Sequence, residues 1–291
     1  MEHVRVPLFR PTRNGLHFLN SWPSEPDFTL GILGHRFKLG DAAAGLCGGM
    51  AYTVNDCYQA GLLPPRDTVN PAEGTPLFNY IVARLTNSFD EPDVSRYLSW
   101  IQLPDHDTDL VHGVAWHQIT EEWPQIQADL DAGLPAALGL VSGHEAPIAG
   151  FVTGVRDLKH CHQVLAWGYD LDGTSLTIYI YDPDNMDDDS TITLDIGDPR
   201  HGAPIAVSHF PDGFFRGFFR THYHYHDPRT PVSGAFIETV VTSPGISVAG
   251  PISAPLPMRR RWGTCCTPEP LSGPGGASGR CPAAARRPRP D

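Results

Sequence analysis

The spacing of apolar residues changes partway along the chain, from a helical period to near-continuous runs. In the first half, apolar side chains recur three, four and seven positions apart, as at Cys47, Met50 and Val54, which is typical of a helix with one buried face. We expect Gly61 to end this helix and Asp93 to cap a later one. The predicted helices cover residues 44–60, 75–87, 91–100 and 120–132.

The second half of the chain favours β-strands. Short, near-continuous apolar runs are bounded there by glycine, proline and aspartate, which is the pattern of buried strands. Asp172-Gly173 separates two of these runs and is typical of a tight hairpin turn. Helices followed by antiparallel strands predict an α+β fold. The expected strands cover residues 28–33 in an otherwise irregular lead-in, then 134–142, 162–169, 176–182, 191–196, 214–226 and 235–242.

Composition and charge set the domain organisation. The chain has 291 residues, of which 41% are hydrophobic, and this is enough for one large core. Its formal net charge is −12, and because arginines gather beyond residue 250, the body is more acidic still. An acidic body argues against a nucleic-acid partner. We predict one domain over residues 1–245 and a disordered Pro/Gly/Arg-rich tail over 251–291, where the apolar period disappears.

Neither a membrane span nor an export signal is predicted. No run of about 18 uninterrupted apolar residues occurs, and Met1–Arg5 is not followed by the apolar segment of a secretory signal. The body contains three cysteines, Cys47, Cys57 and Cys161. An odd number without a signal fits reduced thiols, although a Cys57–Cys161 pair stays open. We therefore expect a cytoplasmic protein with no membrane partner.

Three residues carry the parts of an activated sulfur nucleophile. Cys47 begins a predicted helix, His162 opens a predicted strand and Asp182 closes the next one. The start of a helix and a nearby imidazolium both stabilise a thiolate. The backbone N–H of Cys47 is predicted to contribute to an oxyanion hole. Gly48 and Gly49 have no side chains, which would let a substrate approach the sulfur.

The predicted hairpin places the imidazole beside a carboxylate. His162 lies at the start of one strand and Asp182 at the end of its partner, so both belong to the open end. The carboxylate would then fix the tautomer and orientation of the ring. Asn185 is the alternative third member, because an amide can orient an imidazole in the same way.

These segments resemble papain-like cysteine peptidases, in particular the bacterial branch that includes the bacteriocin-leader, or double-glycine, peptidases of the C39 type. The resemblance covers about residues 35–200. It implies a papain-like α+β fold, with an N-terminal helical part whose nucleophile helix packs on an antiparallel sheet. It also implies that the third catalytic member is the aspartate of an Asp-Pro pair. The matching segments are Leu46–Ala51, Trp123–Leu140, His162–Asp170 and Ile180–Pro183.

The function expected from these residues and this resemblance is thiol-dependent hydrolysis of a peptide or small amide through an acyl-enzyme on Cys47. No cofactor and no metal ion are required. One position departs from the family, because Asp41 stands where such peptidases usually carry a glutamine that donates to the oxyanion. An acyl transferase of the same fold is one alternative, and a non-catalytic binding module, which Asp41 favours, is another.

Two polar segments suggest metal chemistry less strongly. In a strand, the histidines of His222–His226 would share one face while Tyr223 and Tyr225 pack inward. Alternate strand residues lie about 7 Å apart, which favours a solvated polar face over a shared ion. A metal-binding protein that uses this strand is nevertheless a third alternative. Asp187–Asp189, with Asp184, is interpreted as a solvated acidic loop rather than a Ca²⁺ site.

Overall fold

The structure is a computed structural model that describes most of the first 230 residues. The described residues are 1–22, 27–32, 35–41, 46–142, 161–185, 189–202 and 204–230, without the side chains of 27–32, 35–41 and Glu91. Contacts divide the chain into two compact units, Met1–Ile252 and Ser253–Asp291, and every described residue belongs to the first. The predicted tail and the strand expected at 235–242 lie outside the described residues.

The fold combines helices with an antiparallel sheet, which confirms the α+β class. Three of the predicted helices correspond to α2, α3 and α4. The lead-in is less irregular than expected, because it contains a helix and three strands. The helices are α1 (Pro11–Asn14), α2 (Cys47–Gln59), α3 (Pro76–Ser88), α4 (Glu91–Gln102), α5 (Val114–His117) and α6 (Trp123–Asp131).

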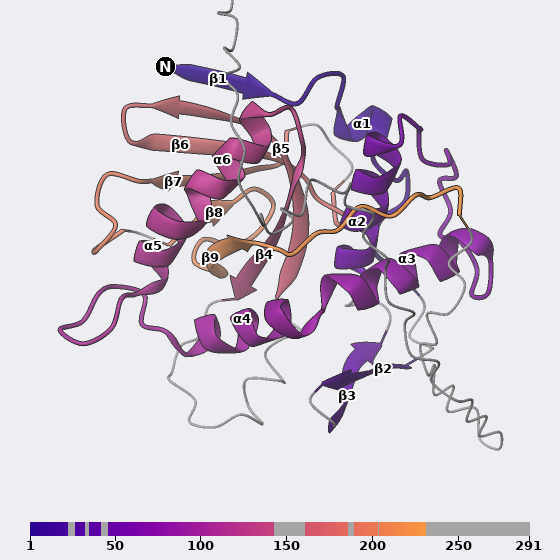
Figure 1. The fold of residues 1–291 in the computed structure, drawn as a ribbon, viewed down its shortest axis with the longest axis horizontal. Coiled ribbons are helices and arrows are strands. Elements are labelled where there is room, and N and C mark those ends of the chain that lie inside the picture. The colour runs from indigo at the N-terminus through magenta and orange to yellow at the C-terminus, as the bar shows by residue number, and fades with distance from the viewer. Residues whose placement is uncertain are drawn as a thin grey trace, which may run out of the picture. The chain divides into compact units, whose positions relative to one another are not determined.

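The strands form one larger sheet and one separate hairpin (Figure 1). The hairpin consists of β2 (Asp27–Ile32) and β3 (His35–Asp41), and β2 corresponds to the strand expected at 28–33. The larger sheet has the order β8-β7-β6-β5-β4-β9, with β1 also paired to β5. Its strands are β1 (Glu2–Arg5), β4 (Ala136–Ser142), β5 (His162–Asp172), β6 (Ser175–Tyr181), β7 (Thr191–Asp195), β8 (Ala206–Val207) and β9 (Phe215–Arg220).

Strand β5 is the longest strand of the sheet, and two strands share one of its edges. β4 pairs with its first half, where Leu140 lies opposite His162, and β1 pairs with its second half, where Val4 lies opposite Tyr169. On the other edge β6 returns after the predicted turn, in which Gly173 has φ +62°. Such a positive φ suits glycine at a tight turn. The open end of this hairpin therefore lies beside β4.

Helix α2 is almost wholly buried, from Cys47 to Cys57, and lies against both α3 and β5. Close packing explains its two glycines. A Cβ on Gly49 would lie 2.1 Å from the carbonyl oxygen of Ile81 in α3, so only glycine fits there. At the other end of α2, Gly61 has φ +67° and Leu62 donates its N–H to the Cys57 carbonyl, which is the predicted glycine cap.

One predicted helix cap and one predicted helix start are wrong. The cap of α4 is Asp90, whose side chain accepts the N–H of Asp93 at 3.0 Å. The helix begins at Glu91, as predicted, and Pro92 fits its first turn, where no N–H is needed. The helix predicted for residues 120–132 is only the second part of a longer helical region. Val114 already begins α5, and a π-helical segment, Gln118–Glu122, leads into α6.

Side chains of the π-helical segment accept hydrogen bonds from backbone N–H groups at the outer edge of the sheet. Gln118 accepts the N–H of Phe218 at 3.3 Å, and Glu122 accepts the N–H of Arg220 at 2.8 Å. These N–H groups belong to β9, an edge strand whose unpaired backbone would otherwise be buried without partners. None of the helices in the described parts of the chain has the length and apolarity needed to cross a membrane.

Candidate functional site

Cys47 is the first residue of α2 and therefore lies in the first turn of this helix, as predicted. The first intrahelical hydrogen bond joins the N–H of Met50 to the carbonyl of Leu46 at 2.9 Å, and no side chain caps this end of the helix. The N–H groups of Cys47, Gly48 and Gly49 therefore precede the helical ladder, and the positive end of the helix dipole lies at the sulfur. Negative charge on or near this sulfur is stabilised by that position.

His162 and Asp182 form a direct hydrogen bond at the open end of the β5–β6 hairpin. His162 is the first residue of β5, and Asp182 follows the last residue of β6. The pairing of Leu165 with Tyr181 brings the two together, and the distance from His162 Nε2 to Asp182 Oδ1 is 2.7 Å. The ring of Phe215 stacks beside the imidazole, with 6.3 Å between the ring centroids. These contacts fix the imidazole plane.

The Cys47 thiol completes the group, because it lies close enough to His162 to raise the pKa of the imidazole. Burial lowers the pKa of His162, but the charges and hydrogen bonds of Asp182 and Cys47 oppose this effect, and the net pKa is well above its ordinary value. The relative exposures are 4% for Cys47, 6% for His162 and 0% for Asp182. The structure thus brings the sulfur, imidazole and carboxylate together in a nearly covered position.

Asn185, the alternative third member, makes other contacts. Its side-chain amide donates to Ser190 Oγ at 2.9 Å, and its backbone N–H donates to the carbonyl of Asp182 at 3.0 Å. His162 Nε2 donates its hydrogen bond to Asp182 Oδ1 instead. The geometry therefore favours the aspartate as the group that orients the ring.

The two glycines after Cys47 have a structural role that the sequence did not indicate. A Cβ on Gly48 would lie 2.2 Å from Ser88 Oγ and 2.4 Å from Gln163 Oε1. Gly48 therefore faces α3 and β5, as Gly49 faces α3. Their lack of side chains allows α2 to approach its neighbours, and substrate approach is not needed to explain it.

The groups that would complete an oxyanion site are only partly described. The backbone N–H of Cys47 lies at the start of α2, where it has no helical partner. Asp41 is the last residue of β3 and pairs with Asp27, but its side chain lies outside the described residues. The same is true of residues 42–45 and 143–160, which directly precede the two segments that carry Cys47 and His162.

A second carboxylate lies near the imidazole and was not singled out as a site residue. Asp184 Oδ2 is 3.9 Å from His162 Nε2, and its side chain is 42% exposed. Burial raises the pKa of Asp184, against the opposing charge of His162. The sequence position of Asp184 could have indicated this place. It follows Asp182 by two residues, in an Asp-Pro-Asp turn that brings both carboxylates to the same end of the hairpin.

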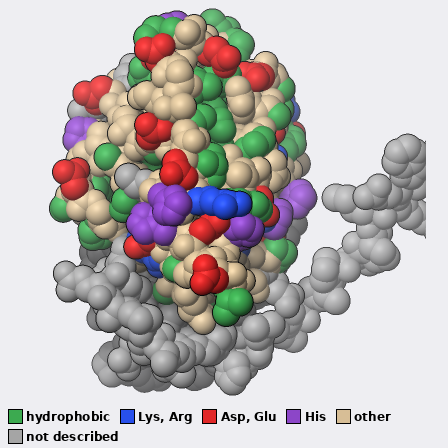
Figure 2. Space-filling model, turned by 90° about the vertical axis from the view of Figure 1, so that its left-hand side faces the viewer, with side chains coloured by type: hydrophobic (Ala, Val, Ile, Leu, Met, Phe, Trp, Pro, Cys, Tyr) green, Lys and Arg blue, Asp and Glu red, His purple; other side chains and the backbone are tan. Residues whose placement is uncertain are grey.

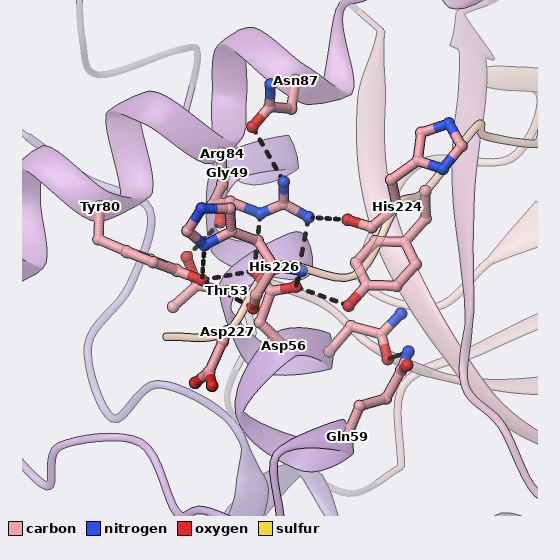
Figure 3. Close-up of polar contacts among 12 residues, drawn as sticks. Gly49, Thr53, Asp56, Gln59, Tyr80, Arg84, Asn87, His224, His226 and Asp227 are labelled. Carbon is pink, nitrogen blue, oxygen red and sulfur yellow. Dashed lines mark hydrogen bonds and ion pairs between the residues drawn. The ribbon is translucent and has the colours of Figure 1, made fainter. Parts of the chain in front are cut away.

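A second buried ionic cluster, also missed, lies near the other end of α2 (Figure 3). The carboxylate of Asp56 pairs with Arg84 of α3, with 2.6 Å between Arg84 Nε and Asp56 Oδ2. It also accepts hydrogen bonds from the hydroxyls of Tyr80 and Tyr223 and from the N–H of His226, at 2.8, 2.6 and 3.0 Å. This network fixes the segment after β9 across α2 and α3.

The predicted strand at His222–His226 is wrong. β9 ends at Arg220, and the backbone N–H of His226 and the carbonyl of His224 bond side chains of the Asp56 network instead of a neighbouring strand. Tyr225 is 46% exposed rather than packed inward. The His224 side chain is exposed, whereas the rings of His222 and His226 lie beside Asp93 and Tyr80 respectively. The three rings therefore contact different parts of the protein.

Other histidines gather on the side of the molecule that carries α5. Figure 2 shows this face, with histidine side chains beside a Lys or Arg side chain among scattered carboxylates. In the turns of this region His112 bonds Asp107 at 2.8 Å and His201 bonds Asp198 at 3.2 Å. Each ring thus has a carboxylate partner. The groups of three potential metal ligands found among the described residues lie elsewhere.

The three cysteines of the body are free thiols, so Cys57 and Cys161 do not pair. Burial, followed by the charge of Asp56, raises the pKa of Cys57 to about 11. Cys57 is therefore an inert thiol on the same helix as Cys47. Comparisons of the chain with protein-family models, curated proteins and solved structures found no match. A function is therefore inferred from the geometry of Cys47, His162 and Asp182.

Proposed function

We propose that the chain is a papain-like cysteine hydrolase that cleaves a peptide or small amide through an acyl-enzyme on Cys47. One observation carries this proposal: the Cys47 thiol lies beside His162, and His162 in turn bonds Asp182. A helix that begins at the thiol and a sheet that supplies the imidazole and then the carboxylate also support the papain-like arrangement, beyond the general α+β class.

The reaction follows from the positions of these groups. Asp182 engages His162 Nε2, which leaves Nδ1 as the nitrogen that serves the sulfur. The thiolate attacks the substrate carbonyl carbon, and the oxyanion that forms is stabilised by the N–H of Cys47 and the start of α2. His162 then gives its proton to the leaving amine, which produces a thioester on Cys47. Water, deprotonated by His162, attacks the thioester and releases the acid.

The raised pKa of His162 supports this assignment. An imidazole that is protonated near neutral pH stabilises a thiolate beside it and has a proton ready for the leaving amine. Asp182 holds that cation without carrying the proton itself. Buried, perturbed titratable groups next to a nucleophile are typical of catalytic sites.

The test compares two thiols of one helix. Native chain is treated with iodoacetamide near neutral pH, and modified cysteines are identified by peptide mass mapping. We expect Cys47 to be alkylated faster than a free thiol and Cys57 to remain unmodified. His162→Ala should slow the reaction of Cys47, whereas Cys57→Ser should not.

Turnover is measured with fluorogenic peptide amides. Cys47→Ser should reduce kcat/KM by about 10³-fold or more, because the nucleophile and its base act as a unit. Cys57→Ser is the matched control and should retain activity. An alkylation rate of Cys47 equal to that of a free thiol, unchanged by His162→Ala, would instead identify a non-catalytic binding module. Acyl transfer to an added amine in place of water would identify the transferase.

A further inference from the structure

A second group of potential ligands lies away from Cys47, where the start of α4 meets the end of β9. Asp90 caps α4, Asp93 belongs to its first turn, and His222 follows β9. Each residue offers one ligand atom, and these atoms all lie within 4.8 Å of one another. The group therefore joins two segments that are more than a hundred residues apart in the sequence.

Two atoms of this group are buried without a hydrogen-bond partner. Asp93 is 0% exposed, and its Oδ1 is one of these atoms. The other is Nδ1 of His222, which lies 3.1 Å from Asp93 Oδ1 without hydrogen-bond geometry. The remaining oxygen of Asp93, Oδ2, accepts the N–H of His222 at 2.9 Å, which fixes the carboxylate. A buried, fixed oxygen without a hydrogen-bond partner among the described residues is available as a ligand atom.

The spacing of these atoms is compatible with a shared metal ion, and they do not form a direct hydrogen bond. Two ligand atoms on a tetrahedral Zn²⁺, each at about 2.0–2.1 Å, lie about 3.3 Å apart. The 3.1 Å between Asp93 Oδ1 and His222 Nδ1 is close to this value. Imidazole nitrogen and carboxylate oxygen are both common zinc ligands.

The charge around the group also favours a cation. Asp90 and Asp93 each offer a carboxylate oxygen, and these atoms lie within 4.8 Å of each other. Arg96 is engaged elsewhere, since it donates to the carbonyl of Arg220 at 2.8 Å and pairs with Glu122 at 3.5 Å. The carboxylates of Asp90 and Asp93 are therefore not neutralised by Arg96.

We propose that Asp90, Asp93 and His222 bind one divalent transition-metal ion, for which Zn²⁺ fits the donor set, with water in the remaining position. The segment that carries His222 is held independently, because Arg84 and Asp56 bond the backbone of His224 and His226 (Figure 3). The ligands are therefore arranged before the ion binds. The ion links the start of α4 to the chain beyond β9 and takes no part in the chemistry at Cys47.

The test measures Zn²⁺ binding and thermal unfolding of the full chain after treatment with a chelator. All variants carry Cys47→Ser, which removes a thiol that could bind Zn²⁺ beside His162. We expect His222→Ala to bind one fewer equivalent of Zn²⁺ and to lose the metal-dependent rise in Tm. His224→Ala, which removes an exposed histidine two residues away, should keep both.

A second variant guards against loss of folding. Asp93→Asn keeps the shape of the side chain but weakens the ligand, and it should lower Zn²⁺ affinity by at least tenfold. Sites formed by cysteines beyond residue 250 would be equally present in all variants. If His222→Ala and His224→Ala bind the same number of Zn²⁺ ions with the same affinity and Tm shift, the proposal is wrong. His222, whose side chain is 40% exposed, can be replaced without opening the core, so this comparison decides the matter.

Discussion

Helix α2 carries two buried clusters of ionisable side chains, one at its first residue and one near its end, and they differ in how fully their polar atoms are paired. The Asp56 carboxylate has a guanidinium, two hydroxyls and a backbone N–H around it. In the other cluster, Asp182 Oδ1 bonds His162, but Asp182 Oδ2 is buried without a hydrogen-bond partner. Both oxygens of the Asp56 carboxylate are therefore hydrogen-bonded, whereas only one oxygen of the Asp182 carboxylate is.

This difference separates a structural site from one suited to chemistry. A carboxylate whose oxygens are all engaged, opposite an arginine that cannot lose its proton, is held in a single charge state. The cluster at Cys47 contains a thiol and an imidazole, which can exchange a proton, at a helix end whose first N–H groups have no partner within the helix. Cys57, the thiol next to Asp56, is unreactive, since burial raises its pKa to about 11.

The largest predicted difference between the two clusters is the loss of stability when one negative charge is removed from each. Asp56→Asn should lower the free energy of unfolding by about 3–5 kcal/mol, because it leaves the buried guanidinium of Arg84 uncompensated. Asp182→Asn should cost less, since His162 can release its proton and become neutral. Unfolding in urea, monitored by circular dichroism, measures both.

Asp227→Asn is the control for these substitutions, because Asp227 pairs with Arg229 at the surface and should leave the free energy of unfolding nearly unchanged. Equal losses for Asp56→Asn and Asp182→Asn would show that the two clusters serve stability alike. That result would remove the distinction between them.

A smaller effect is expected from the glycines that follow Cys47. Gly49→Ala should destabilise the protein by about 1–3 kcal/mol, although alanine favours a helix, because its Cβ meets the backbone of α3. Gly48→Ala should cost less, since the Ser88 and Gln163 side chains that it meets can rotate. Thermal unfolding of the two variants checks this order. A neutral Gly49→Ala variant would mean that α2 and α3 are not held at this distance.

The smallest predicted effect is a pH dependence of stability. The pKa of His162 is raised in the folded state, so the folded protein holds this proton more tightly than the unfolded chain does. The stability that the proton contributes is fully present below the unfolded pKa, about 6.5. It is lost as the pH rises through the folded pKa. In His162→Gln this loss should be absent, which urea unfolding at a series of pH values would measure.

Local patterns in the sequence predicted much of the fold. The stripe of Cys47, Met50 and Val54 predicted α2, and Asp172-Gly173 predicted the β5–β6 hairpin that joins His162 to Asp182. The place of β1 and β9 in the sheet could not be predicted, since it depends on pairing between distant segments. The π-helical segment was missed for a similar reason, because its Gln118 and Glu122 bind the backbone of β9.

The errors around the sites also have physical causes. Alternating His and Tyr residues from His222 to His226 imitate the period of a strand, but the segment bonds side chains of α2 and α3 instead of a neighbouring strand. Asp56 carries no local signal of burial, because its partner Arg84 belongs to another helix. The burial of a side chain whose partners lie on distant segments therefore cannot be predicted from one sequence.

The Asp56 network has a consequence for folding during synthesis. Tyr223 follows Asp56 by 167 residues, so α2 and α3 leave the ribosome long before one of the groups that completes their buried ion pair exists. At about 5–20 residues per second, this interval lasts roughly 10–30 s. Throughout it, the Asp56 and Arg84 charges lack the Tyr223 hydroxyl that later covers them. Final closure of this domain therefore waits until the segment that follows β9 has been synthesised.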